Sequence, residues 1–275
     1  MSGASGLASA LDGRTQLHWE STGDGDPVLL IMGLGLSGGA WWRTVPVLAR
    51  RLRVITFDNR GVGRSRAFSH AYTTDAMADD AATVLEAAGV ERAHVYGISL
   101  GGMVAQKLAL RHPQRVRSLV LGATSPGGPR AVRPDPDVIA FFRRRVHMAA
   151  EEALRASAPI NYSPRCREEH PDRIEEDFAQ RLAHPFSSSA YRAQLFAAAW
   201  HNAYGALPRI AVPTLVVHGR LDRAIPVGNG QLIADRIPGA RLRILDEAGH
   251  LYPTEDPGAD AAIARFFAEQ RKKAA

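Results

Sequence analysis

The distribution of apolar positions along the chain predicts strands alternating with helices. Continuous apolar runs, such as Val28–Met32, are typical of strands buried on both faces of a sheet. Strands are expected over Leu7–Leu11, Thr15–Ser21, Val28–Met32, Arg53–Phe57, Arg92–Ile98, Val116–Leu121, Pro213–His218 and Ala240–Leu245. Helices are expected between them over Trp41–Arg51, Asp75–Ala88, Leu100–Arg111, Gly230–Ile237 and Asp260–Gln270. This order predicts an α/β fold with a mostly parallel eight-stranded sheet flanked by helices.

The pattern changes between Thr124 and Pro208, where no strand-like apolar run occurs. Prolines are frequent at its start, and helices are expected over Val138–Ala150, Asp172–Leu182 and Ala190–Tyr204. The α/β pattern then resumes. We therefore expect a first core segment over 1–123, a helical cap, or lid, over 124–208 inserted after the sixth strand, and a second core segment over 209–275.

Composition is consistent with one cytoplasmic α/β domain. The 275 residues are 45% apolar, which is enough for a sizeable core. No apolar run approaches the roughly 20 residues of a membrane-spanning helix, and residues 1–10 do not resemble a signal peptide. Cys166 is the only cysteine, so no intrachain disulfide can form. It lies among charged residues and is not expected to be a nucleophile.

The net charge of +6 does not by itself indicate a nucleic acid or membrane partner. Arginines are scattered among acids, and no nucleic-acid motif occurs. Histidines and carboxylates show no metal-ligand spacing, so neither a metal nor another cofactor is predicted. The expected partner is a small molecule, bound by a monomer or a homodimer.

The segment Gly97-Ile-Ser-Leu-Gly101 lies between a predicted strand and a predicted helix. This G-x-S-x-G pattern is typical of a nucleophile elbow, in which Ser99 occupies a strained turn that exposes its hydroxyl. Gly97 and Gly101 would leave room across the bend, and Gly102 would let the helix approach the sheet. The alternative is a glycine turn with an incidental serine, so the pattern needs an acid and a base in support.

Two later strands each end near a residue that could supply one of these groups. Asp222 follows the strand Pro213–His218 after a glycine turn, and His250 follows Ala240–Leu245 after a short loop. A serine nucleophile needs a base, and the base needs an orienting carboxylate. Each residue alone could be an ordinary turn aspartate or loop histidine. The order serine, acid, base after three strands predicts a Ser99–Asp222–His250 triad. His218 is assigned to structure.

A competing glycine motif precedes the elbow. Gly33-x-Gly35-x-x-Gly38 follows a strand, and Asp58 ends the next one, as in a dinucleotide-binding fingerprint. A predicted hairpin precedes the motif, however, whereas the fingerprint usually opens the first strand of its sheet. A nicotinamide-dependent oxidoreductase therefore stays an alternative.

The chain resembles the α/β-hydrolase superfamily at Met32-Gly-Leu-Gly35, Asp58–Ser65, Gly97–Gly102, His218-Gly-Arg-Leu-Asp222 and Ala248-Gly-His250. Within it, the chain is most similar to small esterases and lactonases, such as the 3-oxoadipate enol-lactonases and aclacinomycin methylesterases. Met32-Gly33 stands where the superfamily usually has His-Gly. The resemblance implies that the backbone N–H groups of Leu34 and Leu100 form the oxyanion hole.

The resemblance implies a serine hydrolase that cleaves an ester or lactone of a small to medium apolar substrate through an acyl-enzyme. Thioesterase, carbon–carbon hydrolase and perhydrolase chemistry use the same triad, and a non-catalytic ligand-binding protein is a further alternative. Candidate pocket-wall residues are Trp41, Trp42, Met103, Phe141, Trp200 and Tyr252. For each of them, packing in the core is the alternative.

Overall fold

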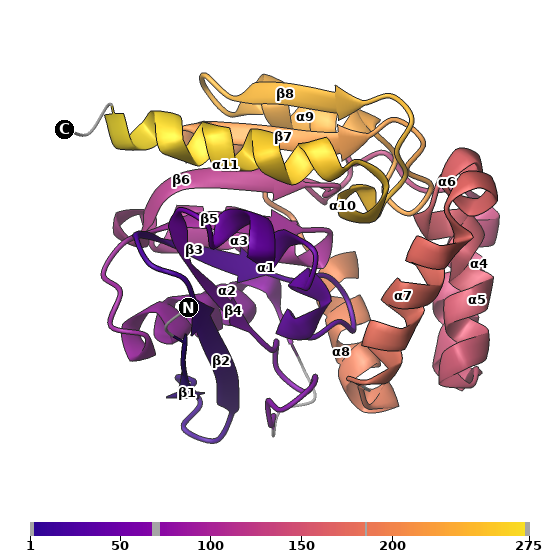
Figure 1. Ribbon diagram of the computed structural model, residues 1–275, viewed down its shortest axis with the longest axis horizontal. Helices are drawn as coiled ribbons and strands as arrows, with labels where there is room; N and C mark the ends of the chain where they lie inside the picture. The colour runs from indigo at the N-terminus through magenta and orange to yellow at the C-terminus, as the bar shows by residue number, and fades with distance from the viewer. Residues whose placement is uncertain (1–2, 68–71, 185, 273–275) are drawn as a thin grey trace.

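The computed structural model describes residues 3–67, 72–184 and 186–272. Its centre is the predicted eight-stranded sheet (Figure 1). The strands are β1 (Gly3–Ser9), β2 (Gln16–Thr22), β3 (Asp26–Ile31), β4 (Leu52–Phe57), β5 (Ala93–Ile98), β6 (Val116–Gly122), β7 (Thr214–Gly219) and β8 (Arg241–Leu245). Their order in space is β1-β2-β4-β3-β5-β6-β7-β8, and only the pairs made by β2 are antiparallel. The prediction of a mostly parallel sheet is confirmed.

Alternate residues of the central strands enter two different cores. Leu29 and Ile31 of β3 pack in one hydrophobic cluster, whereas Val28 and Leu30 pack in another. The side chains of a strand alternate between the two faces of the sheet, so each cluster fills one face. Because both faces are buried, these strands appear in the sequence as continuous apolar runs.

Helices cover both faces. The first cluster includes side chains of α2 (Thr74–Ala87), α3 (Leu100–Arg111) and α9 (Gly228–Arg236). The second includes side chains of α1 (Thr44–Leu48) and α11 (Pro257–Lys272), and α11 lies across the front of the sheet in Figure 1. The short helix α10 precedes α11 and spans Tyr252–Glu255.

The helices between β6 and β7 gather beyond the carboxyl ends of the strands, at the side to which the arrowheads point (Figure 1). They are α4 (Pro136–Arg144), α5 (Ala150–Asn161), α6 (Pro164–Glu169), α7 (Pro171–Leu182) and α8 (Ser188–Ala199). From the sequence, no helix is expected over α5 or α6, each of which contains a proline. Pro164 instead opens α6, a position at which the missing N–H costs nothing, and Pro159 lies in the last turn of α5.

Other predicted helices are shorter than expected. In place of the helix expected over Trp41–Arg51, a 3₁₀ turn ends at Trp41 (Gly38–Trp41) and the five-residue helix α1 follows. Pro46 can be accommodated only near a helix start, which places the first turn of α1 around it. The helix expected over Val138–Ala150 changes to a 3₁₀ turn at Arg145–His147.

Within the described ranges, no helix is both long enough and apolar enough to cross a bilayer. The thiol of Cys166 is buried, and burial raises its pKa to about 11, so it is protonated at neutral pH.

Asp260, in the first turn of α11, is a buried carboxylate that is incompletely satisfied. Its Oδ1 atom has no hydrogen-bond partner among the described residues, and burial raises its pKa from 3.8 to about 6. The folded state therefore binds this proton more tightly than the unfolded chain does. Stability falls as the pH rises from about 4 through about 6, and the loss is complete above that range.

We therefore expect Asp260→Asn to raise the free energy of unfolding by about 3 kcal/mol at pH 8, because two pKa units correspond to roughly that value. The gain should vanish near pH 4. Urea unfolding at both pH values measures it. The exposed Asp235 of α9 is the control, and Asp235→Asn should show no such pH-dependent gain. Equal stability of Asp260→Asn and the wild type at pH 8 would contradict the assignment.

Candidate active site

Ser99 lies at a sharp bend between β5 and α3. Its backbone has φ 56° and ψ −123°, which is a left-handed conformation that residues with a side chain rarely adopt. The side chain is partly exposed, although its neighbours Ile98 and Leu100 are buried. The bend thus presents the hydroxyl at the carboxyl edge of the sheet, as the sequence predicted for an elbow.

Three glycines let the backbone segments around Ser99 approach closely. A Cβ added to Gly97 would lie 2.2 Å from the carbonyl oxygen of Gly101, across the bend. At Gly101 it would lie 1.9 Å from the oxygen of Ile31, on the neighbouring strand β3. At Gly102 it would meet the side chain of Thr124, in the loop after β6. The bend is therefore closed by contacts with β3 and with the loop that follows β6.

The loop that follows β3 lies against the nucleophile. A Cβ on Gly33 would be 3.1 Å from Ser99 Cβ and 3.7 Å from Ser99 Oγ. The next residue is Leu34, one of the two predicted oxyanion donors. In the part of the chain that the structure describes, the backbone N–H groups of Leu34 and Leu100 donate to no protein acceptor. Neither donor is thus engaged by another described part of the protein.

Side chains from distant segments fix the shape of this loop. Asn59 Nδ2 donates to the Met32 carbonyl at 2.9 Å. The Gly35 N–H donates at 2.9 Å to Gln194 Oε1 of α8, and Gln194 Nε2 donates to the Arg60 carbonyl at 3.2 Å. The loop beside Ser99 is therefore held by hydrogen bonds to the buried Asn59 and to Gln194 of α8.

The predicted acid and base form a direct pair. His250 Nδ1 lies 2.8 Å from Asp222 Oδ2, and both side chains are buried. Their loops are joined by backbone hydrogen bonds, from Leu221 N to Ala248 O and from Arg220 N to Leu245 O, both 2.9 Å. Because Asp222 accepts at Nδ1, the other ring nitrogen, Nε2, is the one left for a substrate or nucleophile.

Asp222 is held by further donors. Its Oδ1 accepts from the Ile225 N–H at 2.8 Å, and His218 Nε2 lies 3.2 Å from its Oδ2. His218 Nε2 also lies 2.8 Å from the Ile225 carbonyl, which can only accept, so Nε2 carries a proton. Burial alone raises the pKa of Asp222, but His250 and His218 outweigh burial and hold it below the usual value. The carboxylate is therefore ionised at neutral pH.

Ser99 and His250 lie on the same edge of the sheet but are not hydrogen-bonded to each other. Among the described residues, neither Ser99 Oγ nor His250 Nε2 has a hydrogen-bond partner. In ligand-free enzymes such bonds are often long and tighten only with substrate. The assignment of Ser99 as nucleophile therefore remains a prediction.

Glu255 ties the loop of His250 to the helices between β6 and β7. Its Oε1 accepts from the Gly249 N–H at 2.9 Å, and its Oε2 accepts from the Ser163 N–H at 3.0 Å. The Leu251 N–H adds a bond to the Asn161 carbonyl at 3.0 Å. The position of the base thus depends on the end of α5 and the start of α6.

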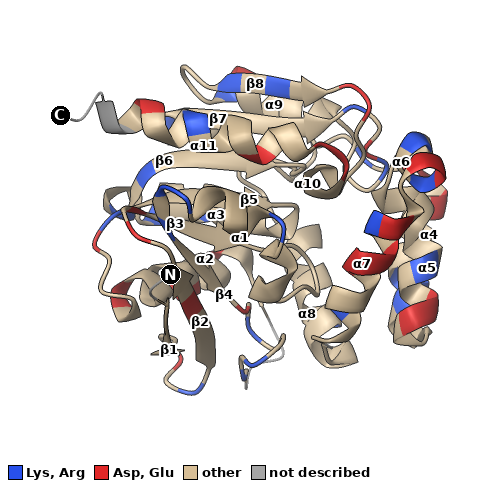
Figure 2. Cartoon of the chain, in the orientation of Figure 1, with Lys and Arg blue, Asp and Glu red and all other residues tan. Residues whose placement is uncertain are grey.

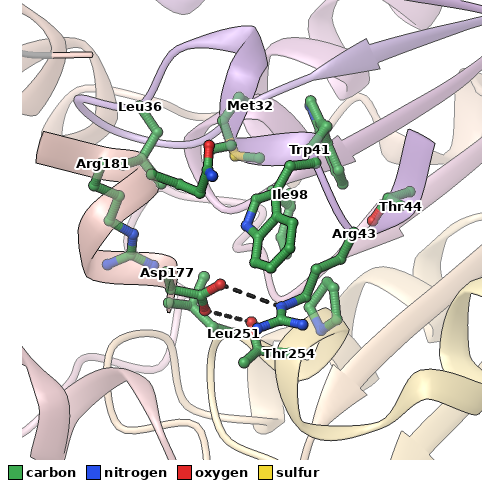
Figure 3. A pocket seen from close by; sticks show the side chains of 14 residues that line it. Met32, Leu36, Trp41, Arg43, Thr44, Ile98, Asp177, Arg181, Leu251 and Thr254 are labelled. Atoms are coloured by element: carbon green, nitrogen blue, oxygen red, sulfur yellow. Dashed lines mark hydrogen bonds and ion pairs between the residues drawn. The ribbon is translucent and has the colours of Figure 1, made fainter. Parts of the chain in front are cut away.

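A cavity adjoins this edge of the sheet (Figure 3). Ile98 and Leu251, the sequence neighbours of Ser99 and His250, lie in its wall, whereas Ser99 and His250 do not. Arg43 reaches Asp177 of α7 from the opposite wall, with Nε 3.3 Å from Oδ1. The cavity is therefore lined by apolar and charged groups together.

The structure separates the six predicted pocket-wall residues. Trp41 and Trp42 line the cavity. Met103, Phe141 and Tyr252 are buried in hydrophobic clusters and are not among the residues of its wall. Trp200 is 75% exposed at the end of α8 and does not line this cavity, so its place in a pocket wall stays a prediction. A helical pattern shows that a side chain is apolar, but tertiary contacts decide what covers it.

The dinucleotide interpretation is not supported by the position of Asp58. Its Oδ1 accepts from the Gly38 N–H at 2.8 Å and its Oδ2 from the Arg64 N–H at 2.9 Å. The residue is 3% exposed, so the carboxylate cannot reach a ribose. The glycine-rich pattern thus belongs to a loop after β3 that is joined to the loop after β4 by hydrogen bonds to the buried Asp58 carboxylate.

Gln194 and Glu255 were missed as parts of the site, and His218 was assigned only to structure. The His218-Gly-Arg-Leu-Asp222 segment gave a signal for the histidine, since it lies four residues from the acid. Gln194 gave none, because its partner Gly35 is 159 residues away.

Comparisons with known proteins agree with this geometry. The family described as alpha/beta hydrolase fold matches residues 26–257. RutD of Azorhizobium caulinodans, provisionally named a carbamate hydrolase, is 35% identical over 89% of this chain and 92% of its own. The 2-hydroxymuconate semialdehyde hydrolase of Pseudomonas sp. strain CF600 is 33% identical, over 95% and 93%. A solved esterase of Thermogutta terrifontis superposes with TM-score 0.82 at 28% identity, over 98% and 99%.

The glycine contacts predict a stability difference between two substitutions. Gly101→Ala should lower the free energy of unfolding by more than about 3 kcal/mol, or prevent folding, because its Cβ would overlap the Ile31 carbonyl. Gly205→Ala is the control, since nothing lies within 4 Å of its added Cβ, and should change stability by less than about 0.5 kcal/mol. Thermal and urea unfolding measure both. Equal stability of the two variants would refute the close packing described at the bend.

Proposed function

Because this chain belongs to the alpha/beta-hydrolase fold family and is a hydrolase by that membership, we propose that it cleaves a carboxylic ester or lactone through an acyl-enzyme on Ser99. The proposal is supported above all by the hydrogen bond between His250 Nδ1 and Asp222 Oδ2, which is 2.8 Å long. It lies at the edge of the sheet where Ser99 forms the bend with a φ of 56°. An imidazole oriented by a carboxylate, on the same sheet edge as a partly exposed serine, is the set of groups that acyl transfer requires.

In the proposed mechanism, Ser99 Oγ attacks the substrate carbonyl while His250 Nε2 takes the hydroxyl proton. Asp222 keeps the proton on Nδ1 and stabilises the imidazolium that forms. The N–H groups of Leu34 and Leu100 bind the developing oxyanion, and one such donor contributes about 3 kcal/mol. His250 then protonates the leaving alkoxide. Water, activated in turn by His250, hydrolyses the acyl-enzyme and restores Ser99.

Ester hydrolysis by the wild type beside Ser99→Ala tests this proposal. With p-nitrophenyl esters of graded acyl length, we expect Ser99→Ala to lower kcat by at least about 10³-fold, because the nucleophile is removed. Labelling by a fluorophosphonate should be lost as well. Ser188→Ala, at the exposed start of α8, is the matched control and should retain both. Full turnover in Ser99→Ala would overturn the assignment of the nucleophile.

A second substitution tests the role given to the acid. Asp222→Asn should lower kcat by about 10⁴-fold with little change in KM, because an amide favours the wrong imidazole tautomer. Stopped-flow kinetics on the best p-nitrophenyl ester measures this loss. A change confined to KM would mean that Asp222 supports substrate binding and not the base.

Hydrolysis of a carbon–carbon bond is the second candidate, favoured by the 33% identity to a 2-hydroxymuconate semialdehyde hydrolase. It would use the same three residues on a ketone substrate. Turnover of 2-hydroxymuconate semialdehyde at a higher kcat/KM than that of any p-nitrophenyl ester would favour this candidate over ester hydrolysis.

A further inference from the structure

His218 lies near the end of β7, four residues before the acid, and its side chain is fully buried. Its Nε2 atom lies 2.8 Å from the Ile225 carbonyl oxygen and 3.2 Å from Asp222 Oδ2. The carbonyl can only accept, so Nε2 carries a proton that is shared between the two oxygens. Asp222 Oδ2 also accepts from His250 Nδ1 at 2.8 Å. Two imidazoles therefore donate to one oxygen of the acid.

A closed ring of hydrogen bonds joins His218, Asp222 and Ile225. The Ile225 N–H donates to Asp222 Oδ1 at 2.8 Å, and the Ile225 carbonyl accepts from His218. A carboxylate held at one oxygen can turn about its Cβ–Cγ bond, whereas donors on both oxygens oppose that rotation. His218 therefore helps to set the direction in which Asp222 Oδ2 faces His250.

The His218 ring is packed so that only one of its nitrogens can donate. A Cβ added to Gly230 of α9 would lie 2.6 Å from Nδ1 and 3.1 Å from Cγ, so the backbone of the helix lies directly against the ring. Within the described ranges, Nδ1 is buried and has no hydrogen-bond partner. A proton at Nδ1 would be buried without an acceptor, which costs free energy, so the ring donates through Nε2 alone.

Charged groups on the neighbouring loops pair with each other at the surface. Figure 2 shows acidic residues directly after β8, where Asp246 and Glu247 lie. Asp246 is 2.6 Å from Arg220 of the loop after β7, and Arg223 is 2.8 Å from Asp137 of α4. The four paired side chains are exposed. Solvent and salt screen exposed charges, so these pairs act only weakly on a buried imidazole.

Glu255 is a half-buried acid beside the His250 loop. Burial raises the pKa of Glu255, and the charge of Asp222 raises it further. The carboxylate of Glu255 accepts from two backbone N–H groups. Among the described residues, the side chains that donate to Asp222 are those of His250 and His218. His218 is therefore the side chain through which the protein can adjust how strongly the acid binds the base.

We propose that His218 is a positioning residue of the triad, whose Nε2–H orients the Asp222 carboxylate and draws part of its charge away from His250. This inference rests on the proposed function and deepens it. Each hydrogen bond to a carboxylate stabilises its negative charge, so a second donor on Oδ2 leaves less stabilisation for the imidazolium of His250. With His218 in place, the base releases its proton in more acidic solution and is available to the nucleophile there.

The pH dependence of kcat/KM for a p-nitrophenyl ester tests this role, because its acidic limb reports the protonation of the base in the free enzyme. His218→Leu removes the donor and leaves the Ile225 N–H on Oδ1. We expect the midpoint of the acidic limb to rise by about 0.5 pH unit or more, because the bond of Asp222 to His250 strengthens. On the plateau, kcat should fall about threefold or more with KM within about twofold, because the carboxylate has lost one restraint.

Two further substitutions show whether the donor or the packing of the ring matters. His218→Gln keeps a side-chain N–H at about the reach of Nε2 and should retain the wild-type midpoint. His218→Asn is too short to reach Asp222 and should show the same rise as His218→Leu. His112→Leu is the control, because it removes a histidine whose Nε2 lies 2.7 Å from Asp79 outside the site, and should leave the profile unchanged. An unchanged or lower midpoint in a folded donor-free variant would overturn the proposal, as would an equal rise in His218→Gln.

A nuclear magnetic resonance titration separates failure of this inference from failure of the proposed function. It follows the Nδ1–H of His250 in protein with isotope-labelled histidine, assigned by its loss in His250→Gln, and needs no substrate. The titration midpoint should be higher in His218→Leu than in the wild type. If no ester is hydrolysed but this rise is observed, the role of His218 stands and ester hydrolysis fails. If esters are hydrolysed and neither midpoint moves, the role of His218 is refuted and the proposed function stands.

Discussion

The positive φ of Ser99 is the constraint on which the site depends. A residue with a side chain held in this conformation costs about 1–3 kcal/mol, which the surrounding structure must compensate. The compensation comes from packing, because Gly97 and Gly101 let the backbone close upon itself and upon β3. Thr124 Oγ1 also donates to the Ser99 carbonyl at 2.7 Å. Strand β3 and the loop after β6 therefore both take part in exposing one hydroxyl.

Much of this arrangement could be predicted from local sequence, because each part follows a strand. The bend at Ser99 and the positions of Asp222 and His250 are marked by glycines next to buried apolar runs. The helices α5 and α6 could not be predicted, since their prolines suggest breaks unless the helix ends are known. Contacts such as Gln194 with Gly35 depend on how distant segments meet, and no local pattern encodes them. The substrate pocket belongs to this second class.

The glycine motif around Gly33 and Gly38 shows how one sequence pattern can arise from different physical causes. In a dinucleotide site, glycines admit a pyrophosphate and the acid binds a ribose. Here Gly33 admits Ser99, and Gly38 gives its N–H to Asp58. A tight turn after a strand and an acid after the next strand are common to both. The structural context of the acid, and not its spacing, separates the two interpretations.

Glu255 has a mechanical consequence. Its carboxylate accepts one hydrogen bond from a backbone N–H of the His250 loop and another from a backbone N–H at the start of α6. The distance between these two segments is therefore fixed by a single planar group. If the helices between β6 and β7 swing away from the sheet, either the bond to Ser163 breaks or the imidazole is displaced with them. Admission of a ligand and the alignment of the base are thereby coupled through a side chain that touches neither.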